Sequence, residues 1–153
     1  MMAAMMSGGD IPSLPYDAEI EYLQSDGNQY IDTGITPSAT LSFECAFQNS
    51  NTGTSPGYGN VFGSRQASNS NEYQLTNFSN LTISIGNRNS NNGATSSKRI
   101  ITFDGGTTVT IDGTQKTITK GTVGSGGGNI VLFGIMQAGA ALADGFSIIK
   151  SNS

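Results

Sequence analysis

Three carboxylates at alternating positions come closest to a catalytic set in this sequence. Asp17, Glu19 and Glu21 lie on one side of an expected strand, and hydrolysis of a glycosidic bond needs two carboxyl groups at a defined separation. The residues between them are apolar and would face a core, so the three carboxylates would lie on the solvated side of the strand. We therefore expect neither catalytic residues nor enzymatic activity.

The sequence has one cysteine and no histidine, which removes most nucleophilic and metal-based chemistry. A nucleophilic triad needs a base that is usually histidine, so Cys45 lacks the usual partner. There is also no Cys/His spacing of a metal site. Cys45 alternates with Phe43 and Phe47, and this pattern predicts a buried, reduced and inert thiol that behaves as a small hydrophobe.

Binding of a sugar usually depends on an exposed aromatic ring with polar groups around it. The chain has no tryptophan, and Tyr58 and Tyr73 are the tyrosines expected beside loops. Tyr58 precedes a predicted strand, so its ring could equally cap the core. The glycine-rich stretch 124–128 lacks the Lys-Ser/Thr pair and the helix of a phosphate-binding loop, and it predicts a flexible connection between strands.

The composition of the 153 residues is that of a single domain with few charges. Charged residues make up 12% of the chain and the net charge is −4, without a basic cluster larger than Lys98-Arg99. Nucleic-acid binding through phosphate neutralisation is therefore not expected, and an acidic surface disfavours anionic membranes. No apolar stretch is long enough to span a bilayer.

Short runs of alternating apolar and polar residues, separated by turn signals, are typical of an all-β sandwich or barrel. No helix is expected. The clearest hairpin turns at Asp112-Gly113, residues 87–97 predict a mobile polar loop, and residues 129–136 predict one strand covered on both faces. The expected strands lie at 16–22, 41–48, 58–65, 72–76, 81–86, 99–104, 109–111, 115–120, 129–136 and 146–150.

Residues 1–15 predict a flexible, irregular arm that precedes a β domain of residues 16–153. Gly8-Gly9 and two prolines interrupt regular pairing. The arm starts with an apolar segment that is too short for the core of a signal peptide and lacks its positive n-region. Two interpretations stay open, an unordered terminus or docking into a groove of a partner through adaptable methionines. These methionines are Met1, Met2, Met5 and Met6.

The segment from Glu21 to Ile35 reads EYLQSDGNQYIDTGI. It resembles the opening EYLxSxGxQYIDTGI of concanavalin-A-like/laminin-G-like jelly-roll proteins, which abound in phages and prophages of gut Bacteroidetes. The Met-rich start also looks like the openings of phage structural proteins from that group. The resemblance covers residues 14 to about 150, and further matches follow in order at Val61–Arg65, Val109–Gly113 and Asn129–Gly134.

The resemblance implies an antiparallel two-sheet jelly-roll sandwich. Such proteins usually continue past the strand that matches residues 146–150 with a returning strand. Three alternatives follow for this chain: the missing strand comes from elsewhere, an edge of the sandwich stays open, or the chain is the front part of a longer protein. We expect a neighbouring subunit or a continuing chain to cover the open edge. Laminarinase-type relatives use an E-x-D-x-x-E arrangement that this sequence lacks. Domains of this kind often hold Ca²⁺ at loop rims, but no ligand set is defined and no other cofactor is expected. Acidic residues at or near turns are Asp26, Asp32, Asp104 and Asp144.

The function that the resemblance implies is structural or adhesive. The leading hypothesis is a non-enzymatic virion protein, namely a head fibre, capsid decoration or tail-associated component on the virion surface, attached to other virion proteins by its N-terminal arm. A homo-oligomer is expected, and a trimer is favoured because such assemblies follow closed symmetry. The alternative is a glycan-binding adhesion module, on a phage fibre or a bacterial cell surface, that contacts a host glycan through Tyr58 and Tyr73.

Overall fold

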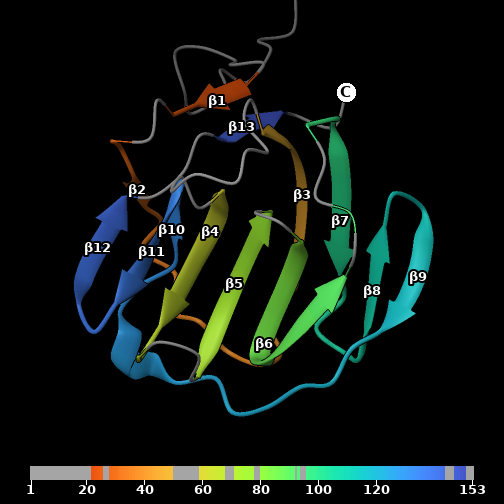
Figure 1. The fold of residues 1–153 in the computed structure, drawn as a ribbon. Helices are drawn as coiled ribbons and strands as arrows, with labels where there is room; N and C mark the ends of the chain where they lie inside the picture. Colours follow the sequence, from red (N-terminus) through yellow and green to blue (C-terminus); the bar gives the residue numbers. More distant parts are fainter. Residues whose placement is uncertain are drawn as a thin grey trace, which may run out of the picture.

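The computed structural model describes residues 22–25, 28–49, 59–67, 71–77, 80–91, 93, 96–143 and 147–150, which form two β-sheets packed face to face (Figure 1). The predicted all-β class and antiparallel two-sheet arrangement are confirmed, and the only helical turn among these residues is the 3-10 turn η1 (Ser125–Gly127). The strands are β1 (Tyr22–Gln24), β2 (Ile31–Asp32), β3 (Phe43–Asn49), β4 (Asn60–Arg65), β5 (Glu72–Asn77), β6 (Leu81–Asn91), β7 (Arg99–Phe103), β8 (Thr108–Ile111), β9 (Thr114–Thr117), β10 (Val131–Leu132), β11 (Gly134–Gln137), β12 (Ala140–Ala143) and β13 (Ser147–Lys150).

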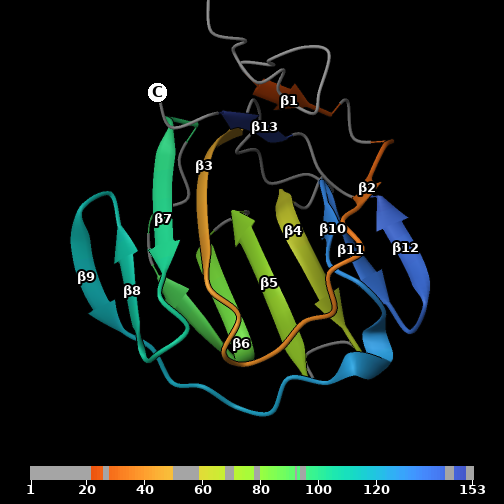
Figure 2. The same ribbon diagram turned by 180° about the vertical axis from the view of Figure 1, so that it is seen from behind.

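The two sheets differ in how the chain builds them. The first sheet has the order β1-β13-β3-β7-β8-β9, so at one end of the sheet the last described strand lies between two strands from the first third of the chain. The second sheet contains β12-β11-β4-β10-β2, with β5 beside β4 and β6 beside β5. The segment from β2 to β3 passes from the second sheet to the first along one end of the sandwich (Figure 2).

The last described strand, β13, has a partner on each side. It pairs antiparallel with β1 and with residues 46–49 of β3. The prediction of an open edge beside this strand is therefore wrong, because β1 closes that side, and the outer strands of the first sheet are β1 and β9. β13 covers only one half of β3, and no other described strand pairs with β3 on this side at Phe43 or Cys45.

The core lies between the sheets because one face of each main strand is apolar. The predicted alternation in β3 is confirmed, since Cys45 and Phe47 are buried and Phe43 is half-buried. Each fully buried large aliphatic or aromatic side chain stabilises the fold by about 1.5–3 kcal/mol. The residues of this core with no exposed surface come from both sheets and are Phe47, Ile101, Val109, Val61, Leu75, Leu81, Ile83 and Ile85.

Strand β6 is longer than predicted, because it continues to Asn91 through residues interpreted from the sequence as a mobile loop. It changes direction at Gly86, whose φ is +75°. Beyond this point, amide side chains bind the backbone of the segment before η1. Asn89 Nδ2 donates to Thr119 O (2.9 Å) and Asn89 Oδ1 accepts from Thr119 N (2.9 Å), while Asn87 Nδ2 donates to Lys120 O (3.1 Å). These hydrogen bonds take the place of pairing with a neighbouring strand. The pattern of apolar residues does not predict them.

The paired bonds of Asn89 give a test of this extension. Asn89→Ala removes both side-chain bonds to Thr119, and we expect the free energy of unfolding to fall by about 1–2 kcal/mol. Gln115→Ala, at an exposed position of β9, is the control and should change it by less than about 0.5 kcal/mol. Urea unfolding of the two variants makes the comparison, and equal values would contradict the role given to Asn89.

The apolar run 129–136 forms two strands instead of the predicted single one. Phe133 has a φ of +61° and is buried, and its N–H donates to Val61 O (2.9 Å). The chain reverses there, so that β10 pairs antiparallel with β4 and β11 pairs parallel with it. An apolar run does not reveal such a reversal, because both strands that it contains are buried.

The glycine-rich stretch 124–128 is a packed turn, so the prediction of a flexible connection there is wrong. Ser64 Oγ donates to Gly128 O (2.9 Å). A Cβ atom at Gly127 would lie 2.4 Å from Arg65 O, a separation that no side chain tolerates. Glycine is needed here for the close approach of η1 to the end of β4.

Candidate functional site

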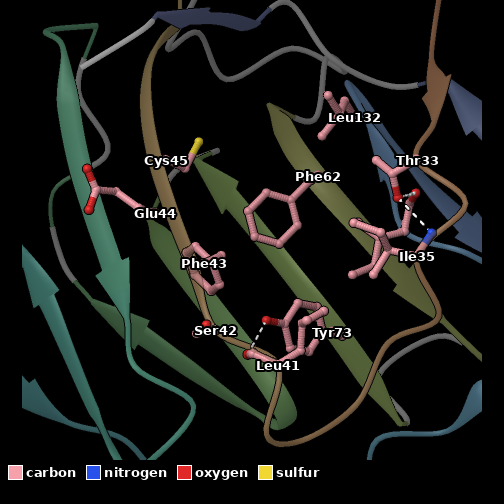
Figure 3. Close-up of a pocket in the computed structure, with 11 residues that line it drawn as sticks. Thr33, Ile35, Leu41, Ser42, Phe43, Glu44, Cys45, Phe62, Tyr73 and Leu132 are labelled. Atoms are coloured by element: carbon pink, nitrogen blue, oxygen red, sulfur yellow. Dashed lines mark hydrogen bonds between the residues drawn. The ribbon is translucent and has the colours of Figure 1, made fainter. Parts of the chain in front are cut away.

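An apolar pocket of about 220 Å³ lies between the two sheets, at the half of β3 that β13 does not cover. Phe43 and Cys45 of β3 line one side, and Phe62 of β4 and Leu132 of β10 line the other (Figure 3). Cavities of about 150 Å³ with apolar walls accept a molecule the size of benzene. The other lining residues are Thr33, Ile35, Leu41, Ser42, Glu44, Tyr73 and Ile130.

The segment of the opening motif that borders the pocket is fixed by backbone bonds to the strand beside it. The N–H and the hydroxyl of Thr33 both donate to Ile130 O, at 3.1 and 2.7 Å. The N–H of Ile130 donates to Ile35 O at 2.8 Å. Thr33 thus supplies two donors to the carbonyl of Ile130 beside the pocket, and its side chain has a structural role.

Three large apolar side chains next to this anchor are exposed. Tyr30, Ile31 and Ile35 are 48%, 43% and 48% exposed, and they are the exposed large hydrophobics of the described residues. Ile31 is the cross-strand partner of Leu132, and directly opposite residues of two strands point to the same face. Ile31 therefore lies on the pocket side of the sheet. We call these three residues the rim.

The interior of the pocket is aromatic. The rings of Phe43 and Phe62 are edge to face with centroids 4.9 Å apart, and the Tyr73 ring lies 6.2 Å from each. The hydroxyl of Tyr73 donates to Leu41 O at 2.7 Å, which satisfies its polar end. Burial also raises the pKa of Tyr73.

The placement of Tyr73 corrects its predicted role. The residue is 1% exposed, so it belongs to the core wall of the pocket and cannot present a ring to a glycan on the surface. The alternation of Tyr73 with Leu75 was the signal that assigns it to the core. Tyr58, the other tyrosine of the predicted glycan site, lies outside the described residues, as do the carboxylates at 17, 19 and 21 and the methionines at 1, 2, 5 and 6.

Cys45 is a buried free thiol that faces the pocket, as the alternation predicts. Burial raises its pKa from 9.0 to about 12, because an apolar environment disfavours the thiolate. At neutral pH the group is therefore protonated and a poor nucleophile.

This shift predicts a loss of stability in alkali. The folded chain keeps a proton that the unfolded chain releases above its pKa of 9.0, so the free energy of unfolding falls as the pH rises from 9 to about 12. The expected loss from Cys45 is about 1.4 kcal/mol per pH unit in this window. Urea unfolding from pH 7 to 11 should show a smaller loss for Cys45→Ala than for the wild type. Identical pH profiles would contradict the shift.

The opposite face of the second sheet carries buried polar residues. Glu72, Gln74 and Ser84 are at most 2% exposed. Gln74 Nε2 donates to Glu72 Oε2 (3.1 Å), and Arg88, from the part of β6 beyond its bend, lies 3.5 Å from Glu72 Oε1. Within the described residues, Gln74 Oε1 and Ser84 Oγ have no hydrogen-bond partner.

Glu72 is the sole acidic residue in the sequences of β4, β5 and β6. Asp32 of β2 lies on the same face of the sheet, because it pairs with Val131, which pairs with Gly63, the partner of Gln74. The stretch Glu72-x-Gln74-x-x-Asn77 keeps the intervals of the E-x-D-x-x-E arrangement with amides at the second and third positions. Two carboxyl groups are needed for glycoside hydrolysis by either stereochemical route. Among the described residues, the two carboxylates of this face, Glu72 of β5 and Asp32 of β2, lie on strands that β4 and β10 separate.

The turn aspartates within the described residues cap their own turns. Asp32 Oδ1 accepts from Gly34 N (2.9 Å) and Asp104 Oδ1 accepts from Gly106 N (2.8 Å), which is ordinary turn chemistry. Among the described residues, no group of three or more His, Cys, Asp or Glu side chains is arranged to hold a metal ion. Asp26 and Asp144 lie outside those residues.

Comparisons with known proteins identify no relative of this chain. A scan against protein-family models gives no match, and searches of curated proteins and of solved structures give none either. Within the part of the chain that the structure describes, no helix is long and apolar enough to cross a membrane.

Proposed function

We propose that the protein is a non-enzymatic structural component of a bacteriophage particle, a head fibre, capsid decoration or tail-associated protein with a jelly-roll domain. In this proposal the pocket and the rim form the surface through which the sandwich contacts neighbouring subunits at the virion surface. Neighbouring subunits hold the domain in place, and the rest of its surface faces outward from the particle.

The observation that carries the proposal is the exposed rim beside an apolar pocket. Tyr30, Ile31 and Ile35 each expose more than two fifths of their surface within six consecutive positions. Exposed apolar surface next to a pocket is a feature of contact sites for proteins or ligands. A permanent protein partner is the occupant that removes this surface from water at all times.

The sequence supports the same assignment. The rim belongs to the stretch YIDTGI, residues 30–35, on which the resemblance to phage jelly-roll proteins rests most heavily. Hydrogen bonds explain Asp32, Thr33 and Gly34 as local structure. They give no reason for isoleucine at positions 31 and 35, whereas a partner that covers both side chains does.

The test is the location of the protein in a lysate of the host that carries its gene. Released particles are purified on a density gradient and labelled with antibodies against the sandwich domain. We expect the chain to co-sediment with intact particles and gold label to decorate their surface in electron micrographs. Recovery of the chain only in the particle-free fractions would overturn the proposal.

Glycan binding is the second candidate, and one observation favours it. The ring of Tyr30 is 48% exposed and lies two positions from Asp32, whose Oδ2 is 3.4 Å from Asn129 Nδ2. An exposed ring next to polar groups suits stacking on a sugar. Binding on an array of host surface polysaccharides that Tyr30→Ala abolishes would support an adhesion role, and silence of the wild type across the array would remove it.

A further inference from the structure

We infer that the pocket receives the Met-rich segment, residues 1–6, of a second copy of this chain. The inference rests on the proposed function, because the repeated subunits of a particle bring neighbouring copies together. In this arrangement, the N-terminal arm of one copy binds the pocket and rim of another copy.

The chemistry of the pocket selects an apolar, adaptable occupant. Phe43, Phe62 and Tyr73 present three aromatic rings to it, and Cys45 lines the same side as Phe43. Methionine is unbranched, fills irregular apolar spaces and makes favourable contacts between its sulfur and aromatic rings. The pocket volume of about 220 Å³ exceeds that of a benzene-sized cavity, and it suits one or two such side chains.

The sequence contains one segment with this character. Four of the five methionines of the chain lie among its first six residues, and the other two residues of the segment are alanines. Met136 is the remaining methionine and is buried in its own fold. Four methionines exposed to water would make no favourable apolar contacts. Burial of one such side chain in an apolar site contributes about 1.5–3 kcal/mol to the free energy of binding.

The surface around the pocket points to a neighbouring copy as the donor. A six-residue segment can fill the pocket, but Ile31, which lies on the pocket side of the sheet, is exposed and does not itself line the pocket. A second copy supplies the segment for the pocket and a folded body that covers the rim. Fifteen residues separate Met6 from Tyr22, and an extended chain of that length spans up to about 50 Å, which is enough to reach across an interface.

The experiment uses the full chain with a photoreactive diazirine analogue of methionine in place of all five methionines. Chains with light and heavy isotopes are mixed in denaturant, refolded together and irradiated, and cross-linked peptides are identified by mass spectrometry. We expect cross-links from residues 1–6 to the peptides that contain Cys45, Phe62 or Leu132. About half of them should join a light peptide to a heavy one. Cross-links of the buried Met136 should stay within one isotope and serve as the internal control.

A variant that fills the pocket distinguishes loss of binding at the pocket from loss of folding. Cys45→Leu adds apolar volume inside the pocket, and we expect it to reduce the mixed-isotope cross-links at least tenfold while the Met136 cross-links persist. Links of residues 1–6 within one isotope only, links to other surfaces, or no links at all would each overturn the inference. None of these outcomes bears on whether the chain is found on particles, so the proposed function is tested independently.

Discussion

Replacing Gly86 by alanine is expected to lower the free energy of unfolding by at least about 3 kcal/mol. A left-handed backbone costs an L-residue about 1–2 kcal/mol, and Gly86 has a φ of +75°. In addition, a Cβ at this position would lie 2.2 Å from the carbonyl carbon of Gly121. Backbone atoms cannot move aside as a flexible side chain does, so the bend in β6 would open and expose Glu72 and Gln74.

Gly113 provides the matched control for this prediction. It has a φ of +81° in the hairpin turn between β8 and β9, and a Cβ there would meet no atom within 4 Å. Gly113→Ala therefore carries the conformational cost alone, about 1–2 kcal/mol. Urea unfolding of both variants gives the difference. Equal losses would mean that the contact between Gly86 and Gly121 does not hold the bend.

Replacing Ile31 and Ile35 together by serine is expected to weaken self-association about 30- to 100-fold. Each side chain exposes nearly half of its surface in the single chain, and burial of that surface contributes about 1–1.5 kcal/mol per residue. Two residues thus supply about 2–3 kcal/mol, and each 1.4 kcal/mol is a factor of ten in the dissociation constant. Sedimentation analysis over a range of concentrations measures the change.

The free energy of unfolding of the rim variant should fall by no more than about 2–3 kcal/mol, because only the buried half of each side chain stabilises the fold. The control is Gln115→Ser, which alters an exposed residue on β9 at the far edge of the first sheet. It should leave the dissociation constant unchanged. Unaltered association of the double variant would exclude the rim from the interface.

Local patterns predicted the parts of the fold that depend on neighbours in the sequence. The alternation around Cys45 placed its thiol in the core, and the structure confirms this. The hairpin at Asp112-Gly113 was predicted from its turn residues, and both have positive φ values, as this type of turn requires. These features depend on side-chain period and turn chemistry alone.

Features that depend on distant contacts were missed. Asn89 belongs to a strand because its amide binds Thr119, thirty positions away. Phe133 reverses the chain because it is held against Val61 of β4. Glu72 is buried although it alternates with core residues, and the part of β6 beyond Gly86 brings Arg88 to it.

Of the described residues that were predicted for a site, only Tyr73 lines the pocket, and the pocket itself was not predicted. The methionine arm and the YIDTGI stretch were both singled out by sequence, whereas the pocket combines residues from β3, β4, β5 and β10 with the segment after β2. No local period signals that these residues converge. Tyr73 shows the difficulty, because the same ring serves as a core residue and as a wall of the pocket.

The central claim is that this sandwich is an assembly module whose apolar face binds a copy of its own chain. Light scattering of the full chain tests it most directly, beside a full-length variant in which Met2, Met5 and Met6 are serine. The account predicts a closed oligomer for the wild type, with a trimer of about three times 15.8 kDa favoured, and dissociation of the variant toward the monomer. A wild type that stays at 15.8 kDa across all concentrations, with the variant indistinguishable from it, would contradict the account.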